Sequence, residues 1–323
     1  SELLKGVADS KVKLTYLREG KTETTTLTRG AIDVRAVPFY QLISNDVGYI
    51  VLSKFNKKTT VETKAALEDL KSQGATKIIL DLRGNPGGLL TEAINVVNLF
   101  VPKGAAIVTT KSAIKKYNKT YKTQKPAFDT EIPLVVLVNG RSASASEIVS
   151  GGLQDLDRAV IIGARSFGKG LVQRPKKLTY GTQLKVTISR YYTPSGRCIQ
   201  ALDYWNRDEN GDPVRIDVKK YSSFKTKGGR TVYDGGGIMP DIELKSGEFS
   251  PITTALLKDQ AIFDYATNYY YAHKIDEWND FVFTDSDFQD FLQFLKYNNF
   301  EYKTESEKLF SKALRKSEDE HLQ

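Results

Sequence analysis

The spacing of hydrophobic positions near the start of the chain predicts a β-hairpin. Val12, Leu14 and Tyr16 alternate with polar residues, and residues 19–21 have the composition of a tight turn. Residues 1–10 have the pattern of a helix end. A helix end and a hairpin bury too little surface to fold alone. We therefore expect residues 1–34 to complete a domain whose earlier part lies upstream of Ser1.

From residue 47 onwards, continuous apolar segments alternate with segments of helical period. This pattern predicts a strand in residues 47–55 and buried strands in 77–84, 132–139 and 159–163. It also predicts helices in residues 59–74, 89–100 and 146–156, and a more exposed strand in 182–194. Thr59 and Glu62 have the spacing of a capping box at the start of the first helix, and Gly74 ends it. The alternation predicts an α/β core with a largely parallel sheet.

The pattern changes again in the last quarter of the chain. Residues 204–240 are rich in turn-forming residues, whereas residues 251–274 and 285–302 have aromatic side chains at helical spacing. The last eight residues are polar, and we expect that end to fray. We therefore predict three parts, which are the domain fragment 1–34, an α/β core 35–245 and a helical extension 246–323.

Composition excludes some classes of protein. The 323 residues are 40% hydrophobic and 27% charged, and no apolar segment reaches the roughly 20 residues of a membrane span. The net charge is +8, and six lysines cluster at positions 111, 115, 116, 119, 122 and 125. No nucleic-acid-binding motif accompanies them, so we interpret them as a solvated surface and expect no nucleic-acid partner. The single cysteine, Cys198, excludes an internal disulfide and a cysteine zinc site.

The chain has only two histidines, which restricts the bases available to a catalytic serine. His321 lies two residues from the end and His273 lies in an aromatic segment, so neither is near a candidate nucleophile in sequence. A Ser-His-Asp triad is therefore disfavoured. Lysine is the usual substitute for histidine as the base of a serine nucleophile.

Two glycine- and serine-rich loops follow apolar strands, where the ligand sites of α/β sheets lie. The first is DLRGNPGG at residues 81–88, and the second is NGRSASAS at residues 139–146. Gly87 and Gly88 either form a tight turn or expose amides to a reacting oxyanion. The serines of the second loop either cap the next helix or include a nucleophile.

Lys169 lies between Gly168 and Gly170 in the sequence RSFGKGLVQ. Flanking glycines suit a lysine that enters a crowded site from unusual backbone dihedrals. A lysine acts as a base only when it is neutral, which a dry site without a carboxylate favours. The alternatives are a solvated lysine or one that faces a phosphate, although the residues do not match a Walker loop.

Five motifs together resemble the C-terminal processing peptidases, or tail-specific proteases. They are DLRGNPGG, NGRSASASEIVSGGLQD, GARSFGKGLVQ, YYTPSGRCIQ and DGGGIMPDIEL, in the family's order and spacing within residues 1–245. The resemblance implies that Ser144 is the nucleophile, that Lys169, 25 residues later, is the base, and that Gln173 orients the lysine. It also implies an oxyanion hole made of the Ala145 amide and a loop glycine, for which we favour Gly88 over Gly87. Ser142 and Ser146 are then interpreted as turn and cap, and Cys198 as a packed residue.

The resemblance further implies a Clp protease/crotonase-like spiral core, a PDZ fragment in residues 1–34 and a bacterial, extracytoplasmic protein, of the periplasm or envelope and similar to Bacteroidetes members. The implied activity is that of a serine endopeptidase that needs no cofactor or metal and selects proteins by their C-terminal tails. Whether the protein is a dimer stays open. Two alternatives also stay open, a non-catalytic peptide-binding scaffold and a crotonase-like acyl-CoA enzyme, although the latter does not require this serine and lysine.

Overall fold

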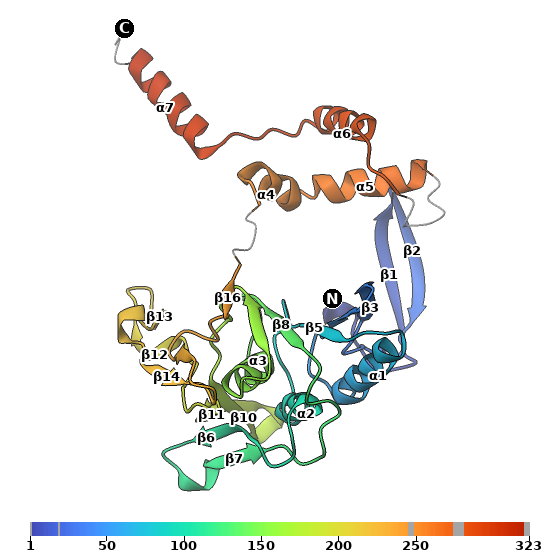
Figure 1. The fold of residues 1–323 in the computed structure, drawn as a ribbon. Coiled ribbons are helices and arrows are strands. Elements are labelled where there is room, and N and C mark those ends of the chain that lie inside the picture. The colour runs from blue at the N-terminus through green and yellow to red at the C-terminus, as the bar shows by residue number, and fades with distance from the viewer. Residues whose placement is uncertain (1, 19, 245–248, 274–280, 320–323) are drawn as a thin grey trace. The chain divides into compact units, whose positions relative to one another are not determined.

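The computed structural model describes residues 2–18, 20–244, 249–273 and 281–319 (Figure 1). The chain divides into two compact units, Ser1–Ser246 and Gly247–Gln323, which are described separately. Among the described residues, no helix combines the length and the apolar character that a membrane span requires.

A six-stranded sheet forms the centre of the first unit. Its strands are β3 (Phe39–Ser44), β4 (Val47–Val51), β5 (Lys77–Asp81), β8 (Leu134–Val138), β9 (Val160–Gly163) and β16 (Ile242–Glu243). Their order is β16-β9-β8-β5-β4-β3, and every pair is parallel except β3–β4. This confirms the predicted largely parallel sheet. Ile50, Leu80, Val136 and Ile161 are fully buried, as expected for strands covered on both faces.

Three helices connect the parallel strands, which cannot be joined by tight turns. They are α1 (Thr59–Ser72), α2 (Leu90–Phe100) and α3 (Ala145–Asp155). The predicted capping box of α1 is wrong. The Glu62 carboxylate instead accepts hydrogen bonds from the amides of Ala36 and Val37, at 2.7 and 2.9 Å, and so attaches the helix to the chain before β3.

A second, antiparallel sheet has the order β10-β11-β6-β7. Its strands are β10 (Leu171–Lys177), β11 (Gln183–Tyr192), β6 (Ala106–Lys111) and β7 (Lys119–Lys122), with the short 3₁₀ helices η2 (Lys115–Tyr117) and η3 (Thr179–Gly181) in the connections. Only β11 was predicted. Five of the clustered lysines therefore lie in the β6–β7 strand pair and its connection, Lys125 follows β7, and all six are exposed.

Three small hairpins complete the first unit. The first is the predicted hairpin, β1 (Lys11–Arg18) with β2 (Lys21–Thr28), in which Arg18 pairs with Lys21, although the element before it is only a 3₁₀ turn, η1 (Glu2–Leu4). Residue 19 of the predicted turn lies outside the described residues. The turn-rich region contains the other two, β12 (Leu202–Arg207) with β13 (Pro213–Arg215), and β14 (Ser223–Lys225) with β15 (Thr231–Tyr233), together with η4 (Val218–Lys220).

The second unit is helical, as predicted. It contains α4 (Pro251–Lys258), α5 (Ala261–Ala272), α6 (Asp285–Tyr297) and α7 (Glu305–Asp319). The Tyr265 ring contacts Phe291 and Phe294, with centroids 5.0 and 5.5 Å apart, so aromatic packing joins α5 to α6. His273 stacks on Tyr269. His321 and the predicted frayed end at residues 320–323 lie outside the described residues.

Candidate active site

Ser144 occupies the N-cap position of α3, directly after the loop that follows β8. Its φ and ψ are 56° and −109°. A positive φ is costly for a residue with a Cβ and persists only where the surrounding structure enforces it, which happens most often at functional sites. The Ala145 amide, at the first position of α3, is one of the free N–H groups of the helix start, where the helix dipole favours negative charge.

Ser144 also differs in exposure from the other serines of its segment. Ser142, Ser146 and Ser150 are fully buried, whereas Ser144 is half-buried. The Ser142 hydroxyl donates to Leu82 O at 2.8 Å and accepts from the Asn139 amide, as predicted for a turn residue. The Ser146 hydroxyl donates to Asn85 O and the Ser150 hydroxyl donates to Ser146 O. The prediction of Ser146 as a cap is therefore wrong, and Ser144 is the accessible serine of the run.

Asn85, which is fully buried, attaches the glycine loop to the serine loop. Its carbonyl oxygen accepts from the Ala143 amide at 3.0 Å and from the Ser146 hydroxyl at 2.9 Å. Its side-chain amide donates to Leu52 O at 2.7 Å. These bonds bring together two loops that are some 60 residues apart in sequence.

The start of the glycine loop is held by an ion pair. The Asp81 carboxylate, at the end of β5, accepts from the Arg83 guanidinium and amide and from the Tyr49 hydroxyl. These bonds raise the pKa of the Arg83 guanidinium above its usual range, chiefly because it hydrogen-bonds Asp81. A charged fork of this kind fixes where the loop leaves the strand.

Gly87 and Gly88 fill positions that a side chain could not occupy. A Cβ on Gly87 would lie 2.9 Å from both the Ala145 nitrogen and the Ser144 Cβ. A Cβ on Gly88 would lie 2.1 Å from Phe55 O. The Gly87 amide is already bonded to the Asn85 side chain at 2.9 Å. No hydrogen bond of the Gly88 amide is found within the described part of the chain, so this donor is the available one.

Glu147 connects the serine loop to the lysine loop, a role that was not predicted from the sequence. Its side chain is fully buried and accepts four hydrogen bonds. Oε2 accepts from the amides of Ser144 and Lys169, at 2.8 and 2.9 Å. Oε1 accepts from the Ser166 hydroxyl and the Gly168 amide, both at 2.6 Å. Burial raises the pKa of the Glu147 carboxyl, and the four hydrogen bonds oppose that rise.

A sequence signal for Glu147 did exist. It lies three residues after Ser144, at the spacing of a capping box. The other donors, 19 to 22 residues away, could not be identified from that spacing.

Tyr191, on β11, forms a second connection between the two loops. Its hydroxyl donates to Lys169 O and lies 3.3 Å from Ser144 O. Burial raises the pKa of Tyr191 well above its usual range, so the hydroxyl keeps its proton and remains a donor.

The side chain of Lys169 is exposed, which differs from the dry site that we predicted. The backbone of Lys169 is held next to Ser144 by Glu147 and Tyr191, but no side-chain partner of Lys169 is found among the described residues. The amide of Gln173 lies 3.5 Å from the Thr187 hydroxyl, in a pocket beside the lysine loop. The structure therefore brings the backbone of Lys169 to Ser144, and within the described residues it shows no hydrogen bond between Gln173 and Lys169.

Other predicted residues lie outside this arrangement. Cys198 is half-buried, and burial raises the pKa of its thiol, which disfavours the thiolate. The described residues contain no cluster of three His, Cys, Asp or Glu side chains that could hold a metal ion.

Two family profiles match this chain. The first, described as peptidase family S41, matches residues 46–204. The second, described as the C-terminal helical domain of a probable PDZ-protease, matches residues 252–323.

Named relatives agree with the first match. A carboxy-terminal-processing protease of Bartonella bacilliformis is 41% identical over 205 residues, which are 62% of this chain and 46% of that protein. A chloroplastic C-terminal processing peptidase of Tetradesmus obliquus is 36% identical over 211 residues, which are 61% of this chain and 45% of that protein. The chain thus spans about half the length of these curated relatives.

The fold agrees as well. The solved structure of a photosystem II D1 C-terminal processing protease superposes with a TM-score of 0.51 at 31% identity, covering 76% of this chain and 58% of that one. Its similarity extends the sequence match to the arrangement of the core. Residues 46–204 of this chain therefore match peptidase family S41 in both sequence and fold.

Proposed function

We propose that the chain is the catalytic part of a serine endopeptidase with Ser144 as nucleophile and Lys169 as base. The observation that carries the proposal is the environment of Ser144, which is the accessible serine of its run and has a strained backbone at a helix N-terminus. The amides of Ala145 and Gly88 lie in the two loops joined there, and Glu147 connects Ser144 to the lysine loop. The names of the relatives support the same reaction class.

The mechanism follows from these groups. Neutral Lys169 takes the proton of the Ser144 hydroxyl, whose oxygen attacks the scissile carbonyl carbon. The amides of Ala145 and Gly88 stabilise the resulting oxyanion, each by about 3 kcal/mol. The tetrahedral intermediate expels the amine, which receives the proton from Lys169, and leaves an ester on Ser144. Water, deprotonated by Lys169, then hydrolyses the ester and releases the carboxylic acid.

The exposed position of Lys169 adds a requirement to this mechanism. Its side chain must turn toward Ser144 and lose water before it can act as a base, and a bound substrate that covers the loop would provide that environment. In this proposal Gln173 orients the lysine only after the same rearrangement.

Substrate selection is proposed on the resemblance. Residues 1–34 are the end of a PDZ domain, 35–245 the peptidase core and 246–323 a helical extension, in agreement with the name of the profile that matches residues 252–323. PDZ domains bind C-terminal peptides by strand addition. We therefore propose extracytoplasmic protein substrates recognised by their tails. Neither a metal nor another cofactor enters the mechanism.

Cleavage of an unfolded reporter protein with an apolar C-terminal tail tests the proposal. Ser144→Ala and Lys169→Ala are each expected to lower kcat by about a thousandfold or more. Lys177→Ala, an exposed lysine on β10, is the matched control and is expected to keep full activity. Full activity of Lys169→Ala would exclude the proposed base. Tail binding without cleavage by the parent chain would favour the scaffold alternative.

A further inference from the structure

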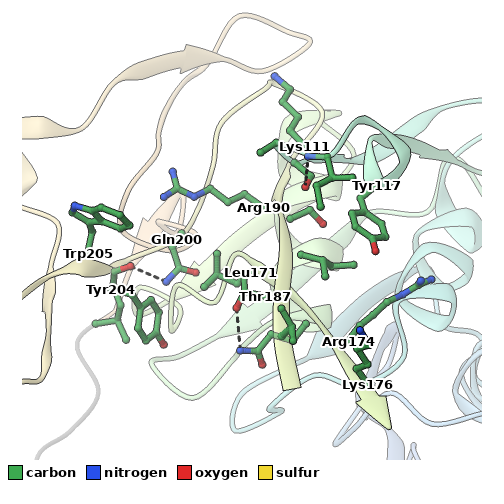
Figure 2. A pocket seen from close by; sticks show the side chains of 18 of the residues that line it. Lys111, Tyr117, Leu171, Arg174, Lys176, Thr187, Arg190, Gln200, Tyr204 and Trp205 are labelled. Atoms are coloured by element: carbon green, nitrogen blue, oxygen red, sulfur yellow. Dashed lines mark hydrogen bonds between the residues drawn. The ribbon is translucent and has the colours of Figure 1, made fainter. Parts of the chain in front are cut away.

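A large pocket lies beside the lysine loop, on the second sheet (Figure 2). Its volume is about 1280 Å³, which exceeds the roughly 300–1,000 Å³ of typical small-molecule sites. Residues of β6, β10, β11 and β12 line it. The size suits a segment of polypeptide better than a metabolite.

The charge of the pocket is strongly asymmetric. Four cationic side chains line it, namely Lys111, Arg174, Lys176 and Arg190. Asp203 is the one carboxylate in the lining. It already accepts hydrogen bonds from the Trp205 amide and the Asn206 side chain, at 2.9 and 2.6 Å.

None of the four cationic groups forms a salt bridge within the described part of the chain. Two of them contact aromatic rings instead. Lys111 Nζ lies 4.5 Å from the centroid of Tyr192, and Arg174 Cζ lies 6.0 Å from that of Tyr117. Gathering unpaired cations in one hollow creates a positive potential that attracts negatively charged ligands.

Apolar surface accompanies the charge. Figure 2 shows Tyr204 and Trp205 on one side of the pocket and Tyr117 on the other, with Arg190 between them. Trp205 is 93% exposed. Exposed aromatic rings beside cations are typical of surfaces that bind peptides, because the rings supply contact area at low cost in side-chain entropy.

The pocket adjoins the loop that carries Lys169. Leu171, in its lining, is two residues beyond Lys169. Gln200, also in the lining, accepts a hydrogen bond from the Gly170 amide at 2.8 Å. A chain bound in the pocket would therefore pass next to the lysine loop.

We propose that this pocket binds an extended acidic peptide segment that also carries apolar or aromatic side chains. The assignment of that segment to a substrate rests on the proposed function, whereas the binding itself does not. A peptide fits better than a nucleic acid because aliphatic side chains, among them Leu184, Val186 and Leu202, line the pocket together with the cations.

Binding is tested with the Ser144→Ala chain, so that no cleavage is needed. Two fluorescent peptides share their apolar residues and differ only in carrying glutamate or lysine at the remaining positions. Fluorescence anisotropy is expected to give an affinity about tenfold or more higher for the glutamate peptide, and this difference should shrink as salt is added.

Matched charge reversals locate the site. Arg174→Glu with Lys176→Glu, added to Ser144→Ala, should remove the preference. Lys177→Glu with Lys185→Glu should keep it, since these exposed lysines lie on β10 and β11, two strands that line the pocket, but are not themselves in its lining. Circular dichroism checks that both double variants fold.

Three results would overturn the proposal: equal affinity for the two peptides, equal losses in the two double variants, or tighter binding of a single-stranded oligonucleotide than of the glutamate peptide. The proposed function is tested separately, by measuring cleavage of the reporter by the chain that retains Ser144. Retained acidic-peptide binding without any cleavage would remove the peptidase proposal and leave the binding site standing.

Discussion

The carboxylate of Glu147 accepts a hydrogen bond from the backbone amide of Lys169 at 2.9 Å. The same oxygen accepts from the Ser144 amide at 2.8 Å, so one buried atom sets the separation of the two loops that carry the proposed nucleophile and base. Through this contact, the backbone of a loop whose lysine side chain is exposed still has a defined position relative to Ser144.

Glu147→Gln should therefore destabilise the fold and the site together. The glutamine NH₂ group replaces one oxygen that accepts two hydrogen bonds, so two buried donors lose their acceptor. At about 1–3 kcal/mol for each, we expect the free energy of unfolding in urea to fall by about 2–6 kcal/mol. The reporter should be cleaved about a hundredfold more slowly, because the base loop shifts.

The matched control for this variant is Glu68→Gln, an exposed glutamate on α1 paired with Lys64. Its free energy of unfolding should change by no more than about 0.5 kcal/mol. If Glu147→Gln is as stable and active as the control, the bridging role of Glu147 is wrong.

Tyr191→Phe should lower kcat markedly and the free energy of unfolding only modestly. The variant loses the hydroxyl that donates to Lys169 O, at a cost of about 0.5–1.5 kcal/mol in unfolding free energy. Since Tyr191 is a positioning residue buried beneath the loops, we expect kcat for a peptide reporter to fall about tenfold or more and KM to change little. In Tyr180→Phe, whose ring is fully exposed, kcat should equal that of the parent. An unchanged kcat in Tyr191→Phe would argue against positioning.

Gly88→Ala should lower the free energy of unfolding and the rate of cleavage far more than Gly84→Ala does. Both glycines have a positive φ, which costs alanine about 1 kcal/mol or more. A methyl group at residue 84 meets no atom within 4 Å, whereas one at residue 88 would lie 2.1 Å from Phe55 O. In chemical unfolding, we expect the free energy of unfolding of Gly88→Ala to fall by about 2 kcal/mol or more beyond the fall in Gly84→Ala. Gly88→Ala should also lose cleavage of the reporter. Equal losses in the two variants would contradict the close approach.

The carboxylate of Asp129 should make the free energy of unfolding depend on pH in the acid range. Burial opposes ionisation of Asp129, but hydrogen bonds from Lys71 and from the amides of Ile132 and Glu131 outweigh it and lower its pKa to about 2. The unfolded value is about 3.9. The stabilisation is thus complete above the unfolded pKa and is lost as the pH falls toward 2.

Asp129→Asn should accordingly lose less unfolding free energy than the parent between about pH 5 and pH 3, as measured in urea. Glu131→Gln, an exposed neighbour, should follow the parent. Identical pH profiles for parent and Asp129→Asn would show that this carboxylate is not linked to folding.

Several elements were predictable because their signal is local. The buried strands β5, β8 and β9 are continuous apolar segments, and α1 to α3 carry helical spacing between them. The run of serines around the start of α3 and the glycine-flanked Lys169 were also visible as short patterns. Each of these features depends on residues within a few positions of one another.

Other features depend on contacts between distant segments, which a single sequence does not contain. The strands β6, β7 and β10 were missed because their lysines and threonines gain a strand conformation only by pairing across the sheet. The role of Glu147 and of Tyr191 exists only where the chain folds back on itself.

The choice among the serines also required the tertiary structure. All of them lie in one local pattern, and folding buries Ser142, Ser146 and Ser150 while leaving Ser144 accessible. The exposure of Lys169 is likewise invisible in its glycine-rich surroundings. Local composition specifies which backbone conformations a segment can adopt, whereas the solvation of a side chain depends on which distant segments cover it.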